Sequence, residues 1–267
     1  MRATHDFQVE KLVTGYENKT IIHGVDLEIP KNQISVIIGA NGCGKSTLLK
    51  TLARLIKPTE GDIMLDGKAI NQYPPKQLAR ILGLLPQSPV VPTGITVADL
   101  VGRGRFPHQS LFKGWSKKDY EAVEEAMEFM NILEFADHDI DELSGGQRQR
   151  VWIAMALAQQ TDILFLDEPT TFLDITYQVE ILDLLTSLNR KYNTTIVMVL
   201  HDINLSARYA DYLFAVKDGK IVAQGKPKKV LTADLVKQVF DLDCIVIPDP
   251  ISSTPLIIPK GRYHVKE

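Results

Sequence analysis

The sequence has little of what marks secreted or membrane-spanning chains. Its 267 residues include only 2 cysteines, Cys43 and Cys244, too few for a disulfide framework, and this usage fits a reducing compartment. The longest apolar stretches, such as residues 151–158, fall far short of the ~20 residues that span a bilayer. Residues 1–6 lack the apolar core of a secretory signal. We therefore expect a soluble chain, which would serve any membrane process as a peripheral subunit.

Net charge is also small. A formal charge of −3 gives no overall basic field of the kind that attracts nucleic acid, so we expect no nucleic-acid partner. We find no internal repeat and no low-complexity linker. With 45% hydrophobic and 24% charged residues, the composition is that of an ordinary globular protein that can bury a substantial core.

What the sequence does contain is a glycine-rich loop, G-x-x-x-x-G-K-S-T, at residues 39–47. An apolar run at residues 34–38 enters it, and a leucine-rich helical pattern leaves it and is expected to end just before Pro58. The glycines allow backbone N–H groups to point at an anion, and the N-terminus of the helix adds partial positive charge. Lys45 supplies a full charge for β- and γ-phosphates, and the Ser46 hydroxyl is placed to ligate Mg²⁺.

The alternative, a glycine-rich turn with an unrelated lysine, does not account for the strand, the helix and the serine together. The loop therefore predicts a nucleoside triphosphate site. The residues that we assign to nucleotide binding here are Gly39, Ala40, Asn41, Gly42, Cys43, Gly44, Lys45, Ser46 and Thr47. The helix N-terminus and Lys45 would lower the thiol pKa of Cys43, although an inert loop filler is an equal alternative.

Periodicity predicts an α/β fold. Residues 7–12 and 25–29 read as strands, and the second alternates apolar and acidic side chains, which predicts an antiparallel sheet with one face in water. Apolar strands at residues 81–85, 163–166 and 195–200 alternate with helices, which predicts a largely parallel sheet. The remaining strand signals are residues 62–65, which enter a tight turn, a hairpin around residues 217–220, and two strand-like runs at residues 244–247 and 256–258.

Candidate catalytic side chains follow the ends of these strands, where ligands of parallel sheets lie. Asp167 can hold Mg²⁺, and the neighbouring Glu168 can orient or deprotonate an attacking water. His201 is placed to bond the γ-phosphate or Glu168, and Gln87 to touch Mg²⁺ or water. Each alone could be an ordinary polar strand end, but their convergence with the phosphate loop favours a function.

Residues 88–143 differ in character, because they mix a Pro- and Gly-rich loop with the aromatic residues Phe106, Phe112 and Trp115 and contain no convincing strand. A helix begins after Ser116, which has the spacing of an N-cap. Its amphipathic stripe comprises Tyr120, Val123, Met127, Met130 and Leu133. We expect a helical subdomain inserted between two strands of the nucleotide-binding core.

Residues 143–147, L-S-G-G-Q, open a helix over residues 148–158. Ser144 is a candidate cap, and the two glycines after it allow an anion to approach the backbone closely. A Ser-Gly-Gly turn that only caps a helix is common, but beside the phosphate loop it predicts a second phosphate-binding helix end. Tyr16, taken alone, is better explained as a packing or surface residue than as a platform for a base.

In this order the motifs resemble those of the ATP-binding-cassette (ABC) ATPases. Residues 39–47 match the Walker A loop, and residues 163–168 match Walker B with its catalytic glutamate. Residues 143–147 match the signature, and residues 171–174 match the D-loop. Among single residues, Gln87 matches the Q-loop glutamine, His201 matches the switch histidine, and Tyr16 matches the aromatic residue that stacks on adenine. The resemblance implies ATP and Mg²⁺ as cofactors. It assigns ATP contacts also to Ser144, Gly145, Gly146, Gln147 and Asp174, and Mg²⁺ ligands to Ser46, Gln87 and Asp167.

The resemblance further implies one P-loop NTPase domain over residues 1–267, with a largely parallel core sheet and an N-terminal antiparallel β subdomain. The helical subdomain would be inserted at residues 88–143, and residues 244–267 would form a C-terminal extension. It also implies a head-to-tail homodimer, in which Ser144, Gly145 and Gly146 of one chain close on the ATP held by the Lys45 of the other.

Longer segments, among them residues 101–108, 141–156 and 168–175, resemble the ferric-siderophore importer ATPases. Phe172 stands where many relatives have tyrosine, a change that should be tolerated. The resemblance implies a peripheral protein on the cytoplasmic face of the cell membrane, bound to permease subunits and served indirectly by an extracytoplasmic siderophore-binding protein.

Importer ATPases for cobalamin or haem share much of the pattern and stay open as alternatives. Three other classes fit less well. A cytosolic ABC ATPase would normally carry two cassettes or a long coiled coil, a P-loop kinase or GTPase would lack residues 143–147, and a regulatory subunit without turnover would not need Glu168 and His201.

Overall fold

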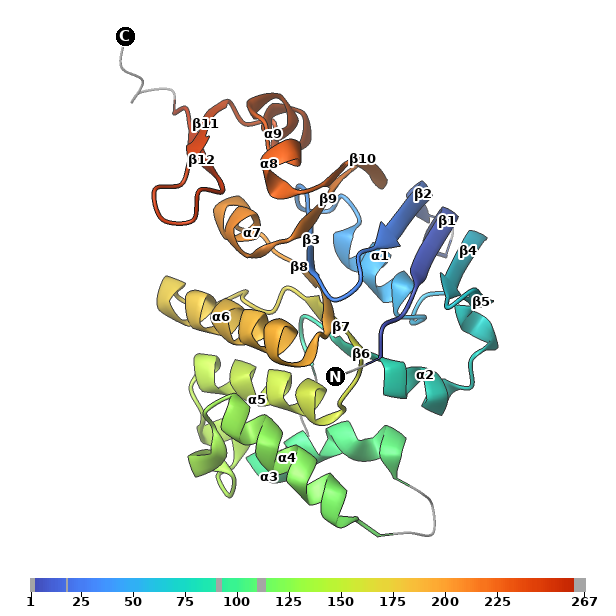
Figure 1. Cartoon of the computed structure of the whole chain (residues 1–267), viewed down its shortest axis with the longest axis vertical. Helices are drawn as coiled ribbons and strands as arrows, with labels where there is room; N and C mark the ends of the chain where they lie inside the picture. The colour runs from blue at the N-terminus through green and yellow to red at the C-terminus, as the bar shows by residue number, and fades with distance from the viewer. Residues whose placement is uncertain (1–2, 18, 90–92, 110–113, 262–267) are drawn as a thin grey trace. The chain divides into compact units, whose positions relative to one another are not determined.

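The computed structural model describes residues 3–17, 19–89, 93–109 and 114–261 (Figure 1). The chain divides into two compact units. The helical unit comprises Asn71–Thr194 together with the N-terminal residues up to Thr4. The loop unit comprises His5–Ile70 and Thr195–Glu267 and contains the predicted phosphate loop.

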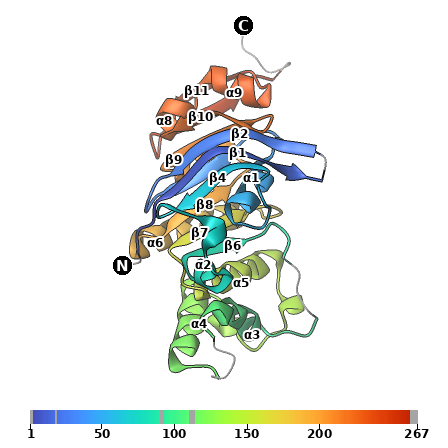
Figure 2. The same cartoon turned by 90° about the vertical axis from the view of Figure 1, so that its right-hand side faces the viewer.

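The loop unit carries an antiparallel sheet. Its strands are β1 (Phe7–Tyr16), β2 (Lys19–Ile29), β4 (Glu60–Leu65) and β5 (Lys68–Ala69), in the order β2-β1-β4-β5. Figure 2 shows β2, β1 and β4 lying side by side. In β2, Val25, Leu27 and Ile29 are buried whereas Asp26 and Glu28 are exposed, which confirms the alternation read from the sequence.

Parallel strands in the same unit position the phosphate loop. β3 (Ile34–Ile38) lies between β8 (Thr195–Val199) and β9 (Tyr212–Lys217) and is parallel to both. Every residue of β3 and β8 is buried, as is typical of a parallel sheet with both faces covered. Since the carboxyl ends of parallel neighbours share one edge, the loop after β3 and His201 after β8 emerge at the same edge.

Short helices and two hairpins complete the loop unit. Its further elements are α1 (Lys45–Leu52), α7 (Ile203–Tyr209), β10 (Lys220–Gly225), α8 (Pro227–Val230), α9 (Ala233–Phe240), β11 (Cys244–Pro248) and β12 (Pro255–Pro259). β9 and β10 form one antiparallel hairpin and β11 and β12 the other. Both hairpins were predicted as strand signals, and both are confirmed.

The helical unit contains the remaining elements, among which α3, α4 and α5 pack together. The elements of the helical unit are η1 (Ile70–Gln72, at the boundary with the loop unit), α2 (Pro75–Ile81), β6 (Leu82–Leu85), α3 (Val97–Gly102), η2 (Arg103–His108), α4 (Lys117–Phe129), η3 (Leu133–Phe135), η4 (Ile140–Glu142), α5 (Gly145–Ala158), β7 (Ile163–Asp167) and α6 (Ile175–Tyr192). β6 and β7 are parallel neighbours. Among the described residues, none of the helices is both long and apolar enough to cross a membrane.

Two details of the predicted helices are wrong. α1 ends at Leu52 rather than just before Pro58, because Arg54 adopts a left-handed conformation and its guanidinium donates a hydrogen bond of 3.0 Å to the Ile70 carbonyl. In the stripe of α4, Tyr120 is 62% and Leu133 40% exposed, so neither belongs to the core. Leu133 leaves the stripe because the helix ends at Phe129.

The start of α4 is confirmed and belongs to a buried polar cluster. Ser116 and Asp119 form a capping box, in which the Asp119 Oδ2 accepts from the Ser116 backbone N–H and hydroxyl. The other oxygen of Asp119 accepts from the Arg105 Nε at 2.9 Å, and Arg105 also donates to the Ala158 carbonyl and the Gln160 side chain. Arg105 and Asp119 are 4% and 6% exposed, so this ion pair ties η2, α4 and the end of α5 together.

We expect Asp119→Asn to lower the free energy of unfolding by about 2–3 kcal/mol, because it leaves the buried Arg105 charge without its carboxylate. Hydrogen bonds from Ser116 and Arg105 lower the pKa of Asp119 from 3.8 to about 2. Since this folded-state pKa is depressed, the stabilisation is present well above pH 3.8 and is lost as the pH falls through about 2.

Urea unfolding of the native chain, Asp119→Asn and Glu121→Gln over this pH range tests the prediction. Glu121 pairs with Lys117 at 3.5 Å in an exposed ion pair, so its variant should change stability by less than about 0.5 kcal/mol. Equal effects of the two substitutions would contradict the importance of the Arg105 pair.

Candidate functional site

The phosphate loop has a backbone that only glycine fits at two positions. Gly44 has φ 106°, and a Cβ atom there would lie 2.9 Å from the Ile22 Cδ1. A Cβ atom on Gly39 would lie 2.3 Å from the Val216 carbonyl oxygen, closer than real Cβ contacts come. The loop is therefore packed tightly between β2 and β9, and its shape is fixed before any ligand binds.

The Lys45 side chain is hydrogen-bonded to carbonyl oxygens of its own loop. Its Nζ donates to the carbonyl oxygens of Gly39 at 2.8 Å and Ala40 at 3.0 Å, and the residue is 5% exposed. A cavity of about 480 Å³, lined in part by Asn41 and Gly42, borders the loop. The ammonium group is thus held at the start of α1, where the first N–H groups of the helix favour an anion.

Cys43 does not have the lowered thiol pKa that the sequence suggested. The residue is buried in the loop, and burial raises the pKa of its thiol, while the neighbouring Lys45 opposes this effect without overcoming it. The reactive interpretation is therefore wrong, and Cys43 fits the alternative of an inert loop residue.

In the helical unit, Glu168 is held at the end of β7. Gln87, which follows the neighbouring strand β6, donates from its Nε2 to the Glu168 Oε2 at 2.5 Å, and the Thr171 hydroxyl donates to the same oxygen at 3.0 Å. Glu168 has φ 56°, an uncommon conformation for a residue with a Cβ atom. Asp167 beside it is 1% exposed. The structure thus brings Gln87, Asp167 and Glu168 together, as the parallel strand order predicts.

The helix end at residues 143–147 is confirmed as a capped N-terminus. The Ser144 Oγ accepts from the Gln147 N–H at 3.3 Å, and the Gln147 Oε1 accepts from the Ser144 N–H at 2.9 Å. A hydroxyl that accepts one bond still has a proton to donate, so this cap is compatible with a phosphate ligand. A Cβ atom on Gly145 would meet nothing within 4 Å, which leaves open space over the backbone there.

Residues 171–174 lead from Glu168 into α6. Asp174 caps this helix, since its Oδ1 accepts from the Tyr177 N–H at 3.1 Å. Phe172 is 95% exposed, so phenylalanine is tolerated there without disturbing a core. The sequence did not identify Thr171 as a partner of Glu168; its only signal was a hydroxyl three residues after the carboxylate.

The other two candidates lie in the loop unit. Tyr16 ends β1 and is 48% exposed, which leaves its ring available as a flat apolar surface. His201 is exposed and stands between β8 and α7, two residues before the helix begins. Their roles in binding adenine and the γ-phosphate stay predictions.

The candidate residues divide between the two units. The loop unit holds Tyr16, residues 39–47 and His201, and the helical unit holds Gln87, residues 144–147, Asp167, Glu168 and Asp174. Oxygen donors of the kind that Mg²⁺ prefers occur in both, as the Ser46 hydroxyl, the Gln87 amide and the Asp167 carboxylate. The chemistry of each of these donors suits this metal.

We expect Cys43 to react with iodoacetamide more slowly than glutathione at pH 7.5, with a rate that rises with pH, because burial raises its thiol pKa. The Cys43→Ser variant identifies the labelled position by mass spectrometry, and labelling in denaturant shows that the thiol itself is intact. Rapid alkylation of Cys43 in the native chain would contradict this account.

Comparisons with known proteins agree with the family that the motifs indicate. A family model described as ABC transporter matches residues 22–171, over half of the chain. The chain is 56% identical to the probable siderophore transport system ATP-binding protein YusV of Bacillus subtilis (strain 168), over 95% of this chain and 92% of that protein. It is 52% identical to the ferric enterobactin transport ATP-binding protein FepC of Escherichia coli (strain K12), over 95% of this chain and 93% of that protein. A dimeric, post-hydrolysis structure of the ATP-binding cassette MJ0796 bound to ADP and Pi has a TM-score of 0.72 at 29% identity, covering 82% of this chain and 98% of that one. This chain belongs to the ABC transporter family.

Proposed function

We propose that this chain is the ATP-binding and ATP-hydrolysing subunit of an importer for iron(III)-siderophore complexes. The observation that carries the proposal is a complete set of motif residues in a chain that is 56% identical, over 95% of its length, to a siderophore transport ATP-binding protein. The preformed loop around Lys45 and the Gln87–Glu168 pair supply the chemistry that such a subunit needs.

ATP binds with its phosphates in the loop at residues 39–47. Two of the three hydrogens on the Lys45 ammonium are engaged by loop carbonyls, which aims the charge along the loop toward the β- and γ-phosphates. The exposed ring of Tyr16 offers a stacking surface for adenine. Ser46, Gln87 and Asp167 would hold Mg²⁺, which neutralises phosphate charge when bound.

Glu168 orients and deprotonates the water that attacks the γ-phosphate. Its carboxylate oxygen Oε2 is fixed by Gln87 and Thr171, so the side chain is held in one direction before the substrate arrives. His201 bonds the γ-phosphate or Glu168. Because Gln87 is tied to Glu168 and precedes α3, η2 and α4, it links the reacting group to these helices of the inserted subdomain.

Two copies of the chain share each ATP. Ser144, Gly145 and Gly146 of one copy close on the nucleotide held by Lys45 of the partner subunit. Gln147, the next residue, and Asp174, at the start of α6, take part in the same contact. The capped helix end, its remaining hydroxyl proton and the open space over Gly145 support this assignment. The dimeric ADP- and phosphate-bound cassette at 29% identity supports a dimer of the same kind.

The permease binds the helical unit on the cytoplasmic face of the membrane, and an extracytoplasmic siderophore-binding protein delivers the substrate to the permease. Phe106 is 74% and Trp115 40% exposed, and both line a cavity of about 540 Å³, which makes them candidate contacts with the permease. The third predicted contact, Phe112, lies outside the described residues.

We expect Glu168→Gln to lower ATP turnover by at least about 100-fold while ATP binding is retained, because the amide cannot accept the proton of the attacking water. Phosphate release and binding of a fluorescent ATP analogue by the purified chain measure the two effects. Glu134→Gln, an exposed acid in the same unit, serves as the matched control and should be silent. Near-normal turnover of Glu168→Gln would remove Glu168 from this role.

We expect cells that lack this chain to lose uptake of radioactive iron(III)-siderophore, and the native chain but not Glu168→Gln to restore it. Uptake of labelled cobalamin and of haem, measured in the same cells, should be unchanged. If iron uptake were normal and cobalamin or haem uptake were lost, the substrate of the importer would be cobalamin or haem rather than an iron(III)-siderophore. Co-purification with the permease identifies the partner.

A further inference from the structure

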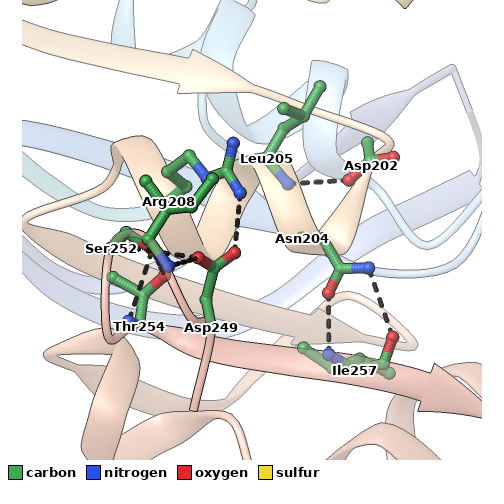
Figure 3. A network of polar contacts seen from close by, with 9 residues as sticks. Asp202, Asn204, Leu205, Arg208, Asp249, Ser252, Thr254 and Ile257 are labelled. Atoms are coloured by element: carbon green, nitrogen blue, oxygen red, sulfur yellow. Dashed lines mark hydrogen bonds and ion pairs between the residues drawn. The ribbon is translucent and has the colours of Figure 1, made fainter. Parts of the chain in front are cut away.

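The hairpin formed by β11 and β12 is bonded to α7, the short helix that follows His201. Figure 3 shows this contact as a network of side chains from α7 that reach the hairpin and its turn. All of these residues lie in the loop unit. The motifs explain His201 but leave the hairpin, at residues 244–259, without a role.

Asp249 connects the turn of the hairpin to α7. Its Oδ1 accepts from the backbone N–H groups of Ile251 at 2.8 Å and Ser252 at 2.9 Å, which shapes the turn. Its Oδ2 accepts from the Arg208 guanidinium at 2.6 Å. The residue is 5% exposed, and the hydrogen bonds from Ser252, Arg208 and Ile251 hold its pKa below the usual range, so it stays ionised at neutral pH.

Asn204 makes the second connection. Its Oδ1 accepts from the Ile257 N–H at 2.8 Å and its Nδ2 donates to the Ile257 carbonyl at 3.2 Å, so one side chain satisfies both backbone groups of a residue in β12. Asn204 and Arg208 are four positions apart, and therefore lie on one face of α7. The helix is thus attached to the hairpin near both of its ends.

The other side of α7 and its first turn are fixed as well. Leu205, Ser206 and Ala207 are buried, and the helix packs against β3. The Asp202 carboxylate caps the helix by accepting from the Leu205 N–H at 2.7 Å, and the Ser206 hydroxyl donates to the Asp202 carbonyl at 2.6 Å. At the open end of the hairpin, α9 packs against β11, and Lys237 of α9 forms an exposed ion pair with Asp243 at 3.0 Å.

His201 stands between these fixed parts. On one side is β8, hydrogen-bonded to β3 up to the pairing of Val199 with Ile37. On the other side is the capped start of α7. The chain from β8 to α7 is too short to vary independently of the helix, so a shift of α7 moves the backbone of His201.

We propose that the β11–β12 hairpin positions His201 for ATP hydrolysis, with Asn204 and Asp249 as the positioning residues. This inference rests on the proposed function, in which His201 acts in turnover. The hairpin and β3 both contact α7 and fix its position, and the first residues of α7 set the position of His201. The C-terminal extension is then part of the hydrolytic machinery of this chain.

Steady-state kinetics of ATP hydrolysis by the full-length chain test the proposal. Asn204→Ala should lower kcat about tenfold with little change in KM, since nucleotide binding uses the loop and only the histidine is displaced. Asp249→Asn keeps an acceptor for the turn N–H groups but loses the Arg208 ion pair, and should lower kcat in the same direction. Ile251→Ala, an exposed side chain of the same turn, is the matched control and should be silent.

A double-mutant cycle separates positioning from general loss of structure. In a His201→Ala background, Asn204→Ala should cause no further loss of kcat, because the group that it positions is absent. An equal loss in both backgrounds, or native kcat in both Asn204→Ala and Asp249→Asn, would overturn the inference. If His201→Ala itself kept native turnover, the proposed role of His201 would fail instead. Thermal unfolding identifies any variant that does not fold. If either Asn204→Ala or Asp249→Asn does not fold, the kcat of the other variant decides the test.

Discussion

ATP binding depends on the way the phosphate loop is held between β2 and β9. Gly39 lies too close to the Val216 carbonyl for a side chain to fit, Gly44 has a φ of 106° that side chains rarely adopt, and Lys45 is bonded back to the loop carbonyls. These contacts constrain the loop in the absence of ATP, and a constrained loop loses less conformational entropy on binding than a free one does. Its position follows from the pairing of β3 with β8 and β9, which also brings His201 to the same edge.

A second constraint lies in the helical unit. There Gln87 and Thr171 fix one oxygen of Glu168, whose backbone conformation is itself uncommon for a residue with a side chain. The capped helix end at Ser144, where α5 begins, belongs to the same unit. In the function that we propose, this helix end of one copy closes on the ATP held by the phosphate loop of the other, so that ATP joins two copies.

The sequence predicted the structure correctly where the signal lay within a few neighbouring residues. Alternation in residues 25–29 predicted the buried face of β2, and the spacing after Ser116 predicted the N-cap of α4. It failed for α2, α3 and α7, since helices of six or seven residues are too short to show a period. It also failed where distant contacts decide, as in the burial that raises the Cys43 pKa and the bonds from Asn204 to Ile257.

The central claim, that each ATP is bound between two chains, is tested most directly by the mass of the chain in solution. Light scattering after size-exclusion chromatography of Glu168→Gln, which should bind ATP without consuming it, gives this mass. The account predicts 29.9 kDa without nucleotide, twice that mass with Mg-ATP, and no doubling when Ser144→Arg is added. A chain that binds ATP at the same affinity with and without the Ser144 substitution, and stays at 29.9 kDa, would contradict it.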